Sequence, residues 1–264
     1  MKKRVNVLAS VFFAAALAAE GAVAGGPGAA PAKVRLVSYN VHHCRGMDNK
    51  VSVGRTAAAI MREKPDFAGL QEVDRNVDRS GFADQPKELA RLTGMHATFA
   101  KAIPLGERGE YGVAVLSREK PLSVRRTPLP GPEPRVLLLC EFADCWFGST
   151  HLDSGILAGG SERCTELSAL IIRREVAKCA AEKPVFLAGD WNSAPGTKAH
   201  RSMCSFMRVV SDETKPTNGN LKRVIDYIAV DSAHARKFKV LEANVTIDTI
   251  ASDHKPVSVS LERL

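Results

Sequence analysis

A short apolar run ends in two polar side chains of types that bind metal ions and phosphates. The run covers residues 185–189 and is followed by Asp190, Trp191 and Asn192. Because side chains of an extended segment alternate between two faces, Asp190 and Asn192 lie on the same face. Open α/β sheets place their ligand sites at strand ends, so we expect both side chains to belong to such a site. The alternative is a polar turn leading into residues 193–196.

The same arrangement recurs along the chain, where further apolar runs end in polar residues. These ends, or the loops that start there, carry Asn40, Glu72, His151, Asp226, Asp253 and His254. Mg²⁺ prefers oxygen ligands, and Glu72 with Asp253 could supply them. A histidine beside a carboxylate suits proton transfer, and asparagine amides can hold a water molecule or a phosphate oxygen. Together these residue types indicate hydrolysis of phosphate esters.

Hydrophobic periodicity places these residues on alternating strands and helices. Residues 34–40 alternate like a strand, and residues 52–63 have a helical pattern that Ser52 can cap. Residues 66–70 form the next strand, which ends in Gln71-Glu72. Such a β-α-β unit delivers the polar ends of both strands to the same edge of a sheet.

The rest of the chain continues this pattern without an internal repeat. Strands are expected at 97–102, 112–116, 122–126, 136–142, 145–151, 185–189, 224–230, 240–247 and 256–261, and helices at 86–92 and 161–181. Residues 74–85 are expected to form a surface loop, and residues 214–223 a polar loop. The buried stripe of the long helix is expected to consist of Leu167, Leu170, Ile171 and Val176.

The N-terminal residues have the features of a secretory signal peptide. Basic residues are followed by an apolar run at 5–19 and by Ala22-Val23-Ala24, which matches a cleavage site. A membrane anchor is the less favoured alternative, because the run falls short of the ~20 residues needed to cross a bilayer. The expected organisation is a signal peptide at 1–24, a flexible lead-in at 25–32 and one folded domain at 33–264. The mature protein is expected to be exported, to the periplasm or beyond the cell, without a membrane span and as a monomer.

Charge and cysteine content limit the partners and covalent links. Without residues 1–24, which hold three basic side chains and one acidic side chain, the formal charge falls from +8 to +6. A basic protein favours an anionic partner, and nucleic acid, acidic lipid headgroups and small phosphate esters all remain open. Six cysteines in an exported chain could form disulfides, and Cys140 and Cys145 are placed to face each other across a hairpin.

An ordered set of motifs resembles one superfamily. The motifs are Ser38-Tyr39-Asn40, Leu70-Gln71-Glu72-Val73, Gly112-Val113-Ala114-Val115-Leu116-Ser117-Arg118, Thr150-His151-Leu152, Gly189-Asp190-Trp191-Asn192, Ile225-Asp226-Tyr227-Ile228 and Ser252-Asp253-His254. In this order they resemble the motifs of the endonuclease/exonuclease/phosphatase superfamily, which has the deoxyribonuclease I-like fold. The resemblance runs from about residue 34 to 261. It implies a four-layered α/β sandwich, two packed mixed sheets flanked by helices, with a Mg²⁺-dependent site where the strand ends converge.

The resemblance also implies a role for each matching position. Glu72 resembles the principal metal ligand of the family, and Asn40 and Asp253 resemble a metal or phosphate contact and a second ligand. Asp190 matches the residue that orients or deprotonates the attacking water, and Asn192 the residue that grips the phosphate.

Two histidines and three weaker candidates complete the set. His254, paired with Asp226, resembles the catalytic histidine–aspartate couple of the family, and the choice of base between Asp190 and His254 stays open. His151 matches the second family histidine, which stabilises charge or protonates the leaving group. Weaker candidates for substrate contacts are Tyr111, His42 and Arg79. Exposed loop residues are usually solvated, and His43 is treated as one of them.

Departures from subfamily patterns narrow the substrate by exclusion. Abasic-site endonucleases carry Gln-Glu-Thr-Lys where this chain has Gln71-Glu72-Val73-Asp74, and an Asp where it has His42. Inositol polyphosphate 5-phosphatases carry a Cys-Asp-Arg run where this chain has residues 223–227. Secreted sphingomyelinases tend to enter lipid with an aromatic hairpin, and no aromatic-rich apolar loop occurs in this sequence.

The expected function is therefore an exported, Mg²⁺-dependent phosphoesterase, with Mn²⁺ as a substitute metal. It is expected to hydrolyse a phosphodiester, in preference to a phosphomonoester, by in-line attack of water. The alternatives are a secreted nuclease acting on DNA or RNA, a phospholipid or sugar-phosphate phosphodiesterase, and a non-catalytic binding module of the same fold.

Overall fold

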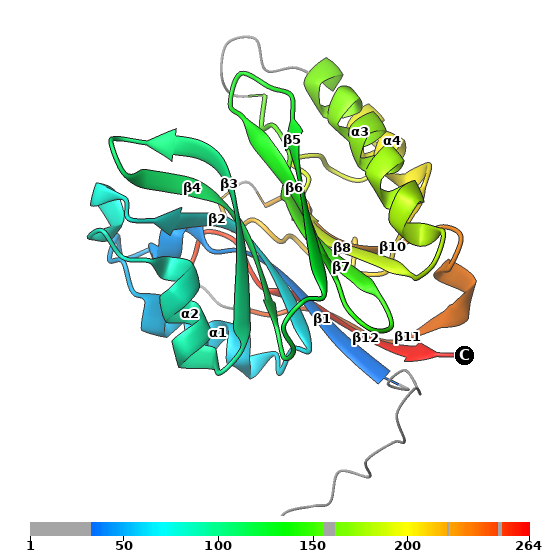
Figure 1. Cartoon of the computed structure of the whole chain (residues 1–264), viewed down its shortest axis with the longest axis horizontal. Coiled ribbons are helices and arrows are strands. Elements are labelled where there is room, and N and C mark those ends of the chain that lie inside the picture. Colours follow the sequence, from blue (N-terminus) through cyan, green and yellow to red (C-terminus); the bar gives the residue numbers. More distant parts are fainter. Residues whose placement is uncertain (1–32, 156–161, 221, 248–249) are drawn as a thin grey trace, which may run out of the picture. The chain divides into compact units, whose positions relative to one another are not determined.

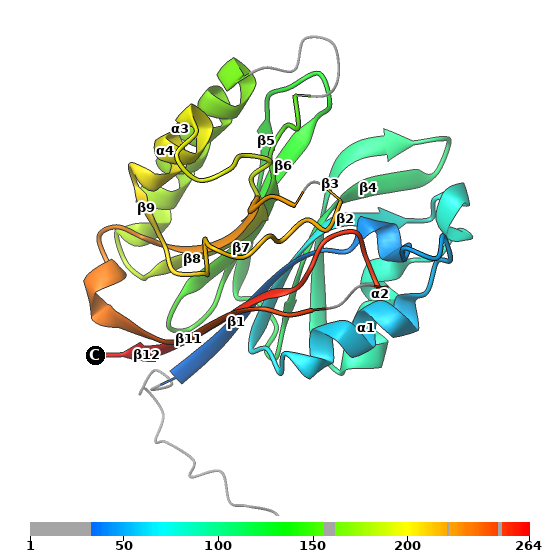
Figure 2. The same ribbon diagram turned by 180° about the vertical axis from the view of Figure 1, so that it is seen from behind.

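Two packed sheets form the centre of the protein. The computed structural model describes residues 33–155, 162–220, 222–247 and 250–264. Their strands form two six-stranded sheets, and helices lie on the outer faces of both (Figures 1 and 2). Both sheets contain parallel and antiparallel pairs. The expected four-layered α/β sandwich is confirmed.

The first sheet contains the β-α-β unit that the sequence indicated. In spatial order it consists of β11 (Phe238–Val245), β12 (Val257–Arg263), β1 (Lys33–Asn40), β2 (Phe67–Arg75), β4 (Gly109–Ser117) and β3 (His96–Leu105). β1 and β2 run parallel on either side of α1 (Val53–Arg62) in the chain, and Asn40 pairs with Gln71. Ser52 caps α1 by accepting a hydrogen bond from the Arg55 amide. The polar ends of both strands therefore reach one edge of the sheet.

The second sheet brings three predicted site residues side by side. In spatial order it consists of β5 (Ser123–Leu129), β6 (Arg135–Glu141), β7 (Trp146–His151), β8 (Val185–Asp190), β10 (Asp226–Asp231) and β9 (Met207–Val209). β7 and β8 are parallel, with His151 opposite Asp190. β10 is antiparallel to β8, with Asp226 opposite Asp190 on the other side. The register of the sheet thus fixes the order His151, Asp190, Asp226.

Three apolar cores hold the four layers together. The first lies between the sheets, and its members include Leu36, Val115, Leu138, Phe186 and Val259. The second packs α3 (Glu162–Ala180) and α4 (Lys198–Cys204) onto one sheet, and the third packs α1 and α2 (Gln85–Thr93) onto the other. A Cβ atom added to Gly69 would lie 2.6 Å from the Ala188 Cβ of the facing sheet. Glycine is therefore needed where the two sheets approach each other closely at this position.

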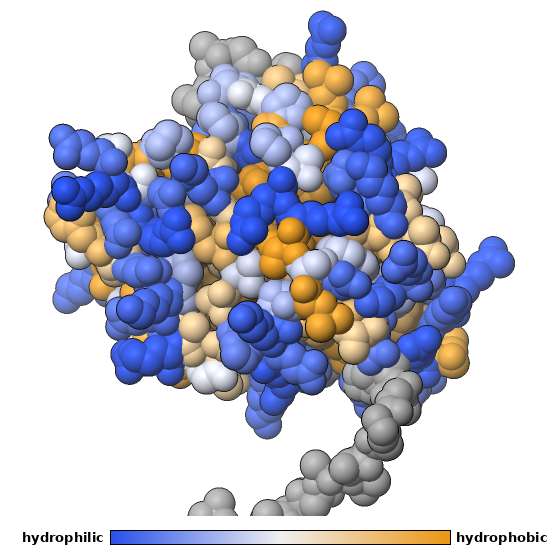
Figure 3. All heavy atoms as spheres, viewed as in Figure 1, coloured by the Kyte–Doolittle hydropathy of each residue, from blue (hydrophilic) through white to orange (hydrophobic). Residues whose placement is uncertain are grey.

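The face of the molecule drawn in Figure 3 is largely polar. Figure 3 shows one face on which hydrophilic side chains predominate and apolar side chains occupy small, separate areas. Among the helices in the described ranges, none is both long enough and apolar enough to cross a membrane.

The buried stripe of α3 differs from the expected one. Leu167 and Leu170 are 43% and 61% exposed, although Val176 is buried as expected. The buried face consists mainly of smaller side chains, namely Thr165, Ser168, Ala169, Ile172, Val176 and Cys179. These residues also follow the helical spacing, and their small size lets the helix lie close to the sheet. Apolar periodicity alone did not decide between the two stripes.

Cys140 and Cys145 do not face each other across the hairpin, as their spacing had suggested. Both cysteines are free and both are buried. β6 and β7 do form the expected hairpin, but Cys140 pairs with Phe147 across the ladder. Cys145 lies opposite Phe142, whose amide donates a hydrogen bond to the Cys145 carbonyl. The two cysteines are thus offset in register.

Candidate active site

The polar strand ends of both sheets meet at a pocket of about 500 Å³. Nine of the predicted site residues line it, namely His42, Glu72, Arg79, Tyr111, His151, Asp190, Asn192, Asp253 and His254. The other two, Asn40 and Asp226, are fully buried and hydrogen-bonded to lining residues. The fold therefore brings all of the predicted residues to one place, although their chemical roles remain predictions.

A β-bulge turns Glu72 into this pocket. The pairing of β2 with β4 shifts register between Leu70 and Val73, and Glu72 has a φ of +57°. A bulge re-aims a side chain, and the left-handed backbone is unfavourable for a residue with a Cβ atom. The adjacent Gln71 is buried and donates a hydrogen bond to Ser149 Oγ on the facing sheet at 3.0 Å. Gln71 thus links the two sheets, and the next residue, Glu72, faces the pocket.

Asn40 joins the two sheets at the centre of the site. Its Nδ2 atom donates to Glu72 Oε1 at 2.9 Å and to Asp190 Oδ2 at 3.1 Å. Its Oδ1 atom accepts a hydrogen bond from the His42 amide at 3.0 Å. The buried Asn40 amide therefore links the Glu72 carboxylate of the first sheet to the Asp190 carboxylate of the second.

Asp190 lies between the two predicted histidines. Its Oδ2 atom is 3.5 Å from His151 Nε2 and 3.7 Å from His254 Nε2. Burial, together with the charge of Asp226, raises the pKa of Asp190 to about 7. A carboxylate with such a pKa is suited to accept a proton near neutral pH.

His254 is held by the carboxylate of Asp226. The His254 Nδ1 atom lies 2.8 Å from Asp226 Oδ2, and Asn218 Nδ2 lies 2.9 Å from His254 Nε2. Burial lowers the pKa of His254, but the Asp226 charge and hydrogen bond, with the charge of Asp190, outweigh it and raise the pKa to about 10. Nδ1 therefore donates to Asp226, and this pairing favours the protonated ring.

His151 is kept neutral by its surroundings. Burial and the nearby charges of Arg135 and His254 lower the pKa of His151 well below its usual value. Arg135 Nη1 lies 3.0 Å from His151 Nδ1. A guanidinium group can only donate, so Nδ1 accepts this hydrogen bond. Asn192 Nδ2 lies 3.0 Å from His151 Nε2 and donates to the Leu152 carbonyl at 2.9 Å.

Comparison with known proteins identifies the family. A model of the Endonuclease/Exonuclease/phosphatase family matches residues 37–254, which contain every residue of the site described above. The chain belongs to this family. Members of the family are hydrolases that act on phosphoester bonds, and they generally depend on a divalent metal ion.

Individual relatives agree with this assignment. The chain is 23% identical to exodeoxyribonuclease III of Haemophilus influenzae over 171 residues, covering 61% of this chain and 58% of that protein. The match thus spans about three fifths of that relative (58%). A crystal structure of an endonuclease/exonuclease/phosphatase from Beutenbergia cavernae has a TM-score of 0.71 at 23% identity, covering 88% of this chain and 72% of that one. A crystal structure from Bacteroides vulgatus has a TM-score of 0.70 at 18% identity, covering 88% and 99%.

Two groups of side chains could hold the divalent ion that the family generally uses. Among the described residues, two groups of three ligand-type side chains have donor atoms within 4.8 Å of one another. They are His42, His43 and Glu72, and Asp190, Asp226 and His254. Asp253 lines the same pocket and reaches the first group through its Oδ1 atom, 3.6 Å from His42 Nδ1. The carboxylates of Glu72 and Asp253 fit a hard divalent cation.

Arg79 and Tyr111 form part of one wall of the pocket. Arg79 makes a two-point ion pair with the fully buried Asp74, at 2.9 Å and 2.8 Å, and its guanidinium carbon lies 5.3 Å from the centre of the Tyr111 ring. Residues 74–85, expected to be a surface loop, in fact begin within β2. Arg79 is therefore a positioned cation and not a freely solvated one.

Sequence reasoning missed three residues of the site and left one open. Arg135, Asn218 and His43 all line the pocket, and His43 is buried although it was expected to be solvated. The sequence does mark Arg135 in one way, because this charged residue directly precedes the apolar run of β6. Trp191, whose role the sequence left open, is fully buried and stacks on Tyr227 with ring centres 4.5 Å apart.

Proposed function

We propose that the protein is an exported, Mg²⁺-dependent phosphodiesterase that hydrolyses its substrate by in-line attack of water. The observation that carries the proposal is the position of Asp190, whose Oδ2 atom lies between two imidazoles and is tied through Asn40 to Glu72. A base, two polar imidazoles and a carboxylate ligand thus converge from both sheets. This combination suits transfer of a phosphoryl group to water.

Each side chain has a role in this reaction. Asp190 accepts a proton from the attacking water, and Asn192 holds a phosphate oxygen. The cationic His254 stabilises negative charge on the phosphate, and Asp226 keeps its ring in place. His151 stabilises the charge that develops on the leaving oxygen. Glu72 and Asp253, with the Asn40 amide nearby, would hold Mg²⁺ or Mn²⁺ as its substitute, which would supply further charge neutralisation on the phosphate.

The preferred substrate class is a phosphodiester. A panel with bis-p-nitrophenyl phosphate, p-nitrophenyl phosphate, DNA, RNA and phospholipids, each with Mg²⁺ or Mn²⁺, tests this. We expect the diester to be cleaved faster than the monoester, and no cleavage after the metal is chelated. Failure to cleave any of these with either metal would remove the proposal and favour a non-catalytic binding module.

A secreted nuclease is the second candidate. The relative from Haemophilus influenzae is named as an exodeoxyribonuclease. The formal charge of +6 that remains without residues 1–24 also suits a polyanionic substrate. For a nuclease, binding of single- or double-stranded DNA should fall steeply with salt concentration. For a phospholipid or sugar-phosphate diesterase, we expect no such steep, salt-dependent binding of DNA.

Export is proposed from the N-terminal sequence, which has a basic start, an apolar run and an Ala-x-Ala site at residues 22–24. Expression of the whole chain, followed by cell fractionation and N-terminal sequencing, tests this. We expect the mature protein outside the cytoplasm with its N-terminus at Gly25. A cytoplasmic protein that retains Met1 would contradict export and leave the proposed chemistry intact.

A further inference from the structure

We propose that His42, His43 and Glu72 together form a metal site with two imidazole ligands and one carboxylate ligand. We further propose that this site binds first-row transition ions, such as Mn²⁺ and Zn²⁺, more tightly than Mg²⁺. The inference rests on the proposed function in one respect, since Glu72 is the metal ligand in both.

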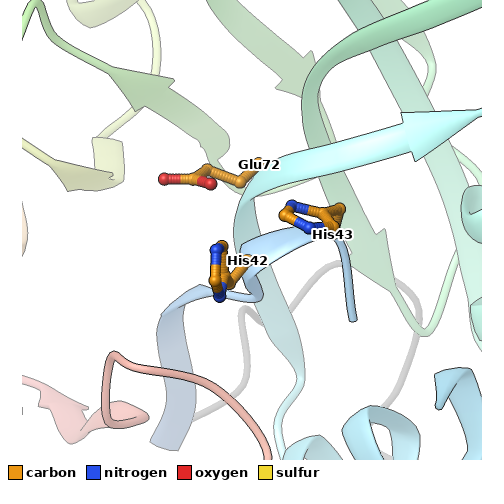
Figure 4. Close-up of side chains that lie close together, drawn as sticks. All are labelled: His42, His43 and Glu72. Carbon is orange, nitrogen blue, oxygen red and sulfur yellow. The ribbon is translucent and has the colours of Figure 1, made fainter. Parts of the chain in front are cut away.

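The three side chains come from two neighbouring segments and point toward one another. His42 and His43 lie in a short 3-10 turn directly after β1, and Glu72 lies in the bulge of β2 (Figure 4). Their donor atoms all lie within 4.8 Å of one another. Metal bonds of about 2.0–2.2 Å place two ligand atoms of one ion roughly 3–4 Å apart. Small rotations of the side chains would therefore bring all three onto one ion.

Two nitrogen atoms of this group are buried without a partner. Among the described residues, neither His42 Nδ1 nor His43 Nδ1 has a hydrogen-bond partner. The Asp253 oxygen near His42 Nδ1 is 3.6 Å away, beyond hydrogen-bond distance. His43 is only 5% exposed, so solvent does not readily replace the missing partner. Buried polar atoms are nearly always satisfied, and a bound cation would satisfy lone pairs that lack a donor.

Nearby charges permit a cation at this position. Among nearby charges, Arg79 acts most unfavourably on a cation at His43, but the fully buried Asp74 pairs with it through two contacts. Asp253 and Glu72 both contribute negative charge to the same pocket. Glu72 also accepts the Asn40 hydrogen bond through Oε1 alone.

The other group of three does not have these features. In the group of Asp190, Asp226 and His254, the His254 ring is hydrogen-bonded to both oxygens of Asp226, at 3.0 Å and 2.8 Å. Asp190 accepts hydrogen bonds from Asn40 and from the Asn192 amide. The polar atoms of this second group therefore have partners, whereas the group around Glu72 contains two buried nitrogen atoms without one in the described part of the chain.

The chemistry of the ligands determines the preferred ion. Mg²⁺ takes oxygen ligands and dehydrates reluctantly, whereas imidazole is a good ligand for Zn²⁺ and other first-row ions. For a given nitrogen and oxygen site, affinity rises from Mn²⁺ to Zn²⁺. We therefore expect the affinity order Zn²⁺, then Mn²⁺, then Mg²⁺.

The decisive experiment is electron spin-echo envelope modulation of the purified whole protein loaded with one equivalent of Mn²⁺. We expect modulation from ¹⁴N nuclei of coordinated imidazole. Isothermal titration with Mn²⁺, Zn²⁺ and Mg²⁺ gives the affinities. Absence of ¹⁴N modulation, or a Mg²⁺ affinity equal to that of Mn²⁺, would overturn the proposal.

Variants locate the ligands. Asparagine tolerates the left-handed backbone of His42 and His43, whose φ values are +45° and +43°, so His42→Asn and His43→Asn preserve the turn. Each should weaken Mn²⁺ binding by about tenfold or more and leave Mg²⁺ binding within about twofold. His96→Asn, at an exposed position in β3, is the matched control and should change neither. Equal loss of both ions in the two variants would contradict the assignment.

The test of this metal site can fail or succeed independently of the test of the proposed phosphodiesterase activity. Nitrogen coordination without hydrolysis of any phosphoester would support the metal site and refute the phosphodiesterase. Hydrolysis with Mg²⁺, but no nitrogen coordination of Mn²⁺, would support the enzyme and refute the site.

Discussion

The side-chain amide of Asn40, at the end of β1, donates a 3.1 Å hydrogen bond to Asp190 Oδ2, at the end of β8 in the opposite sheet. The same nitrogen donates to Glu72. The candidate base and the candidate metal ligand are thus positioned by one group. The geometry of the site therefore depends on how the two sheets pack.

Replacing Asn40 should impair activity more than folding. Asn40→Ala removes the donor that Glu72 and Asp190 share, which costs about 1–3 kcal/mol of stability. We expect kcat for bis-p-nitrophenyl phosphate to fall by about 10²-fold or more, as the loss of an active-site hydrogen-bond donor typically does. Urea denaturation and steady-state kinetics measure the two effects. Asn244→Ala, which removes a hydrogen bond to Glu242 near the surface, is the control and should leave kcat unchanged.

The rate should rise with pH through about 7 and fall near 10. Asp190, with its pKa raised to about 7, must lose its proton before it can accept one from water. Below that pH the carboxyl is protonated and the rate declines. His254, with its pKa raised to about 10, loses its positive charge only in alkaline solution, which gives the upper limb. A pH profile of kcat in constant ionic strength checks this, and an upper limb that persists in His254→Gln would contradict the assignment.

Arg135 should control the protonation of His151. In Arg135→Gln the positive charge is lost, so the pKa of His151 should rise, although burial still keeps it low. We also expect kcat to fall by about tenfold, because the ring loses the group that orients it. An NMR titration of the His151 ring follows the pKa directly. Arg91→Gln, in which an exposed arginine is removed, should leave both quantities unchanged.

Two glycine substitutions should have opposite effects on stability. Gly69→Ala places a Cβ atom 2.6 Å from that of Ala188, so we expect a loss of about 1–3 kcal/mol as the sheets are forced apart. Gly54→Ala adds a Cβ atom with nothing within 4 Å in helix α1, and should raise stability by about 0.5–1 kcal/mol. Chemical denaturation of both variants measures this difference. Equal stability of the two variants would show that the sheets do not meet at Gly69 as described.

Much of the site could be predicted because its residues end apolar strands. Asp190 and His151 were identified in this way, and parallel pairing of β7 and β8 does place them opposite each other. The bulge at Glu72 was not predicted, since a left-handed residue leaves no trace in hydrophobic periodicity. The contact of Arg135 with His151 depends on the pairing of distant segments, which local patterns do not encode. The short elements α4 and β9 were missed for lack of a periodic run.

Metal-dependent hydrolysis by Glu72→Gln tests the central claim most directly. The rate of bis-p-nitrophenyl phosphate hydrolysis would be measured for the purified wild type and for this variant, with Mg²⁺ or Mn²⁺ and again after chelation. Glu182→Gln, at an exposed position, is the charge-matched control. We expect the wild type and the control to hydrolyse the substrate, and chelation to abolish the activity of both. The rate of Glu72→Gln should be lower by about 10²-fold or more. Full metal-dependent activity in Glu72→Gln, or unchanged activity after chelation of the wild type, would contradict the account.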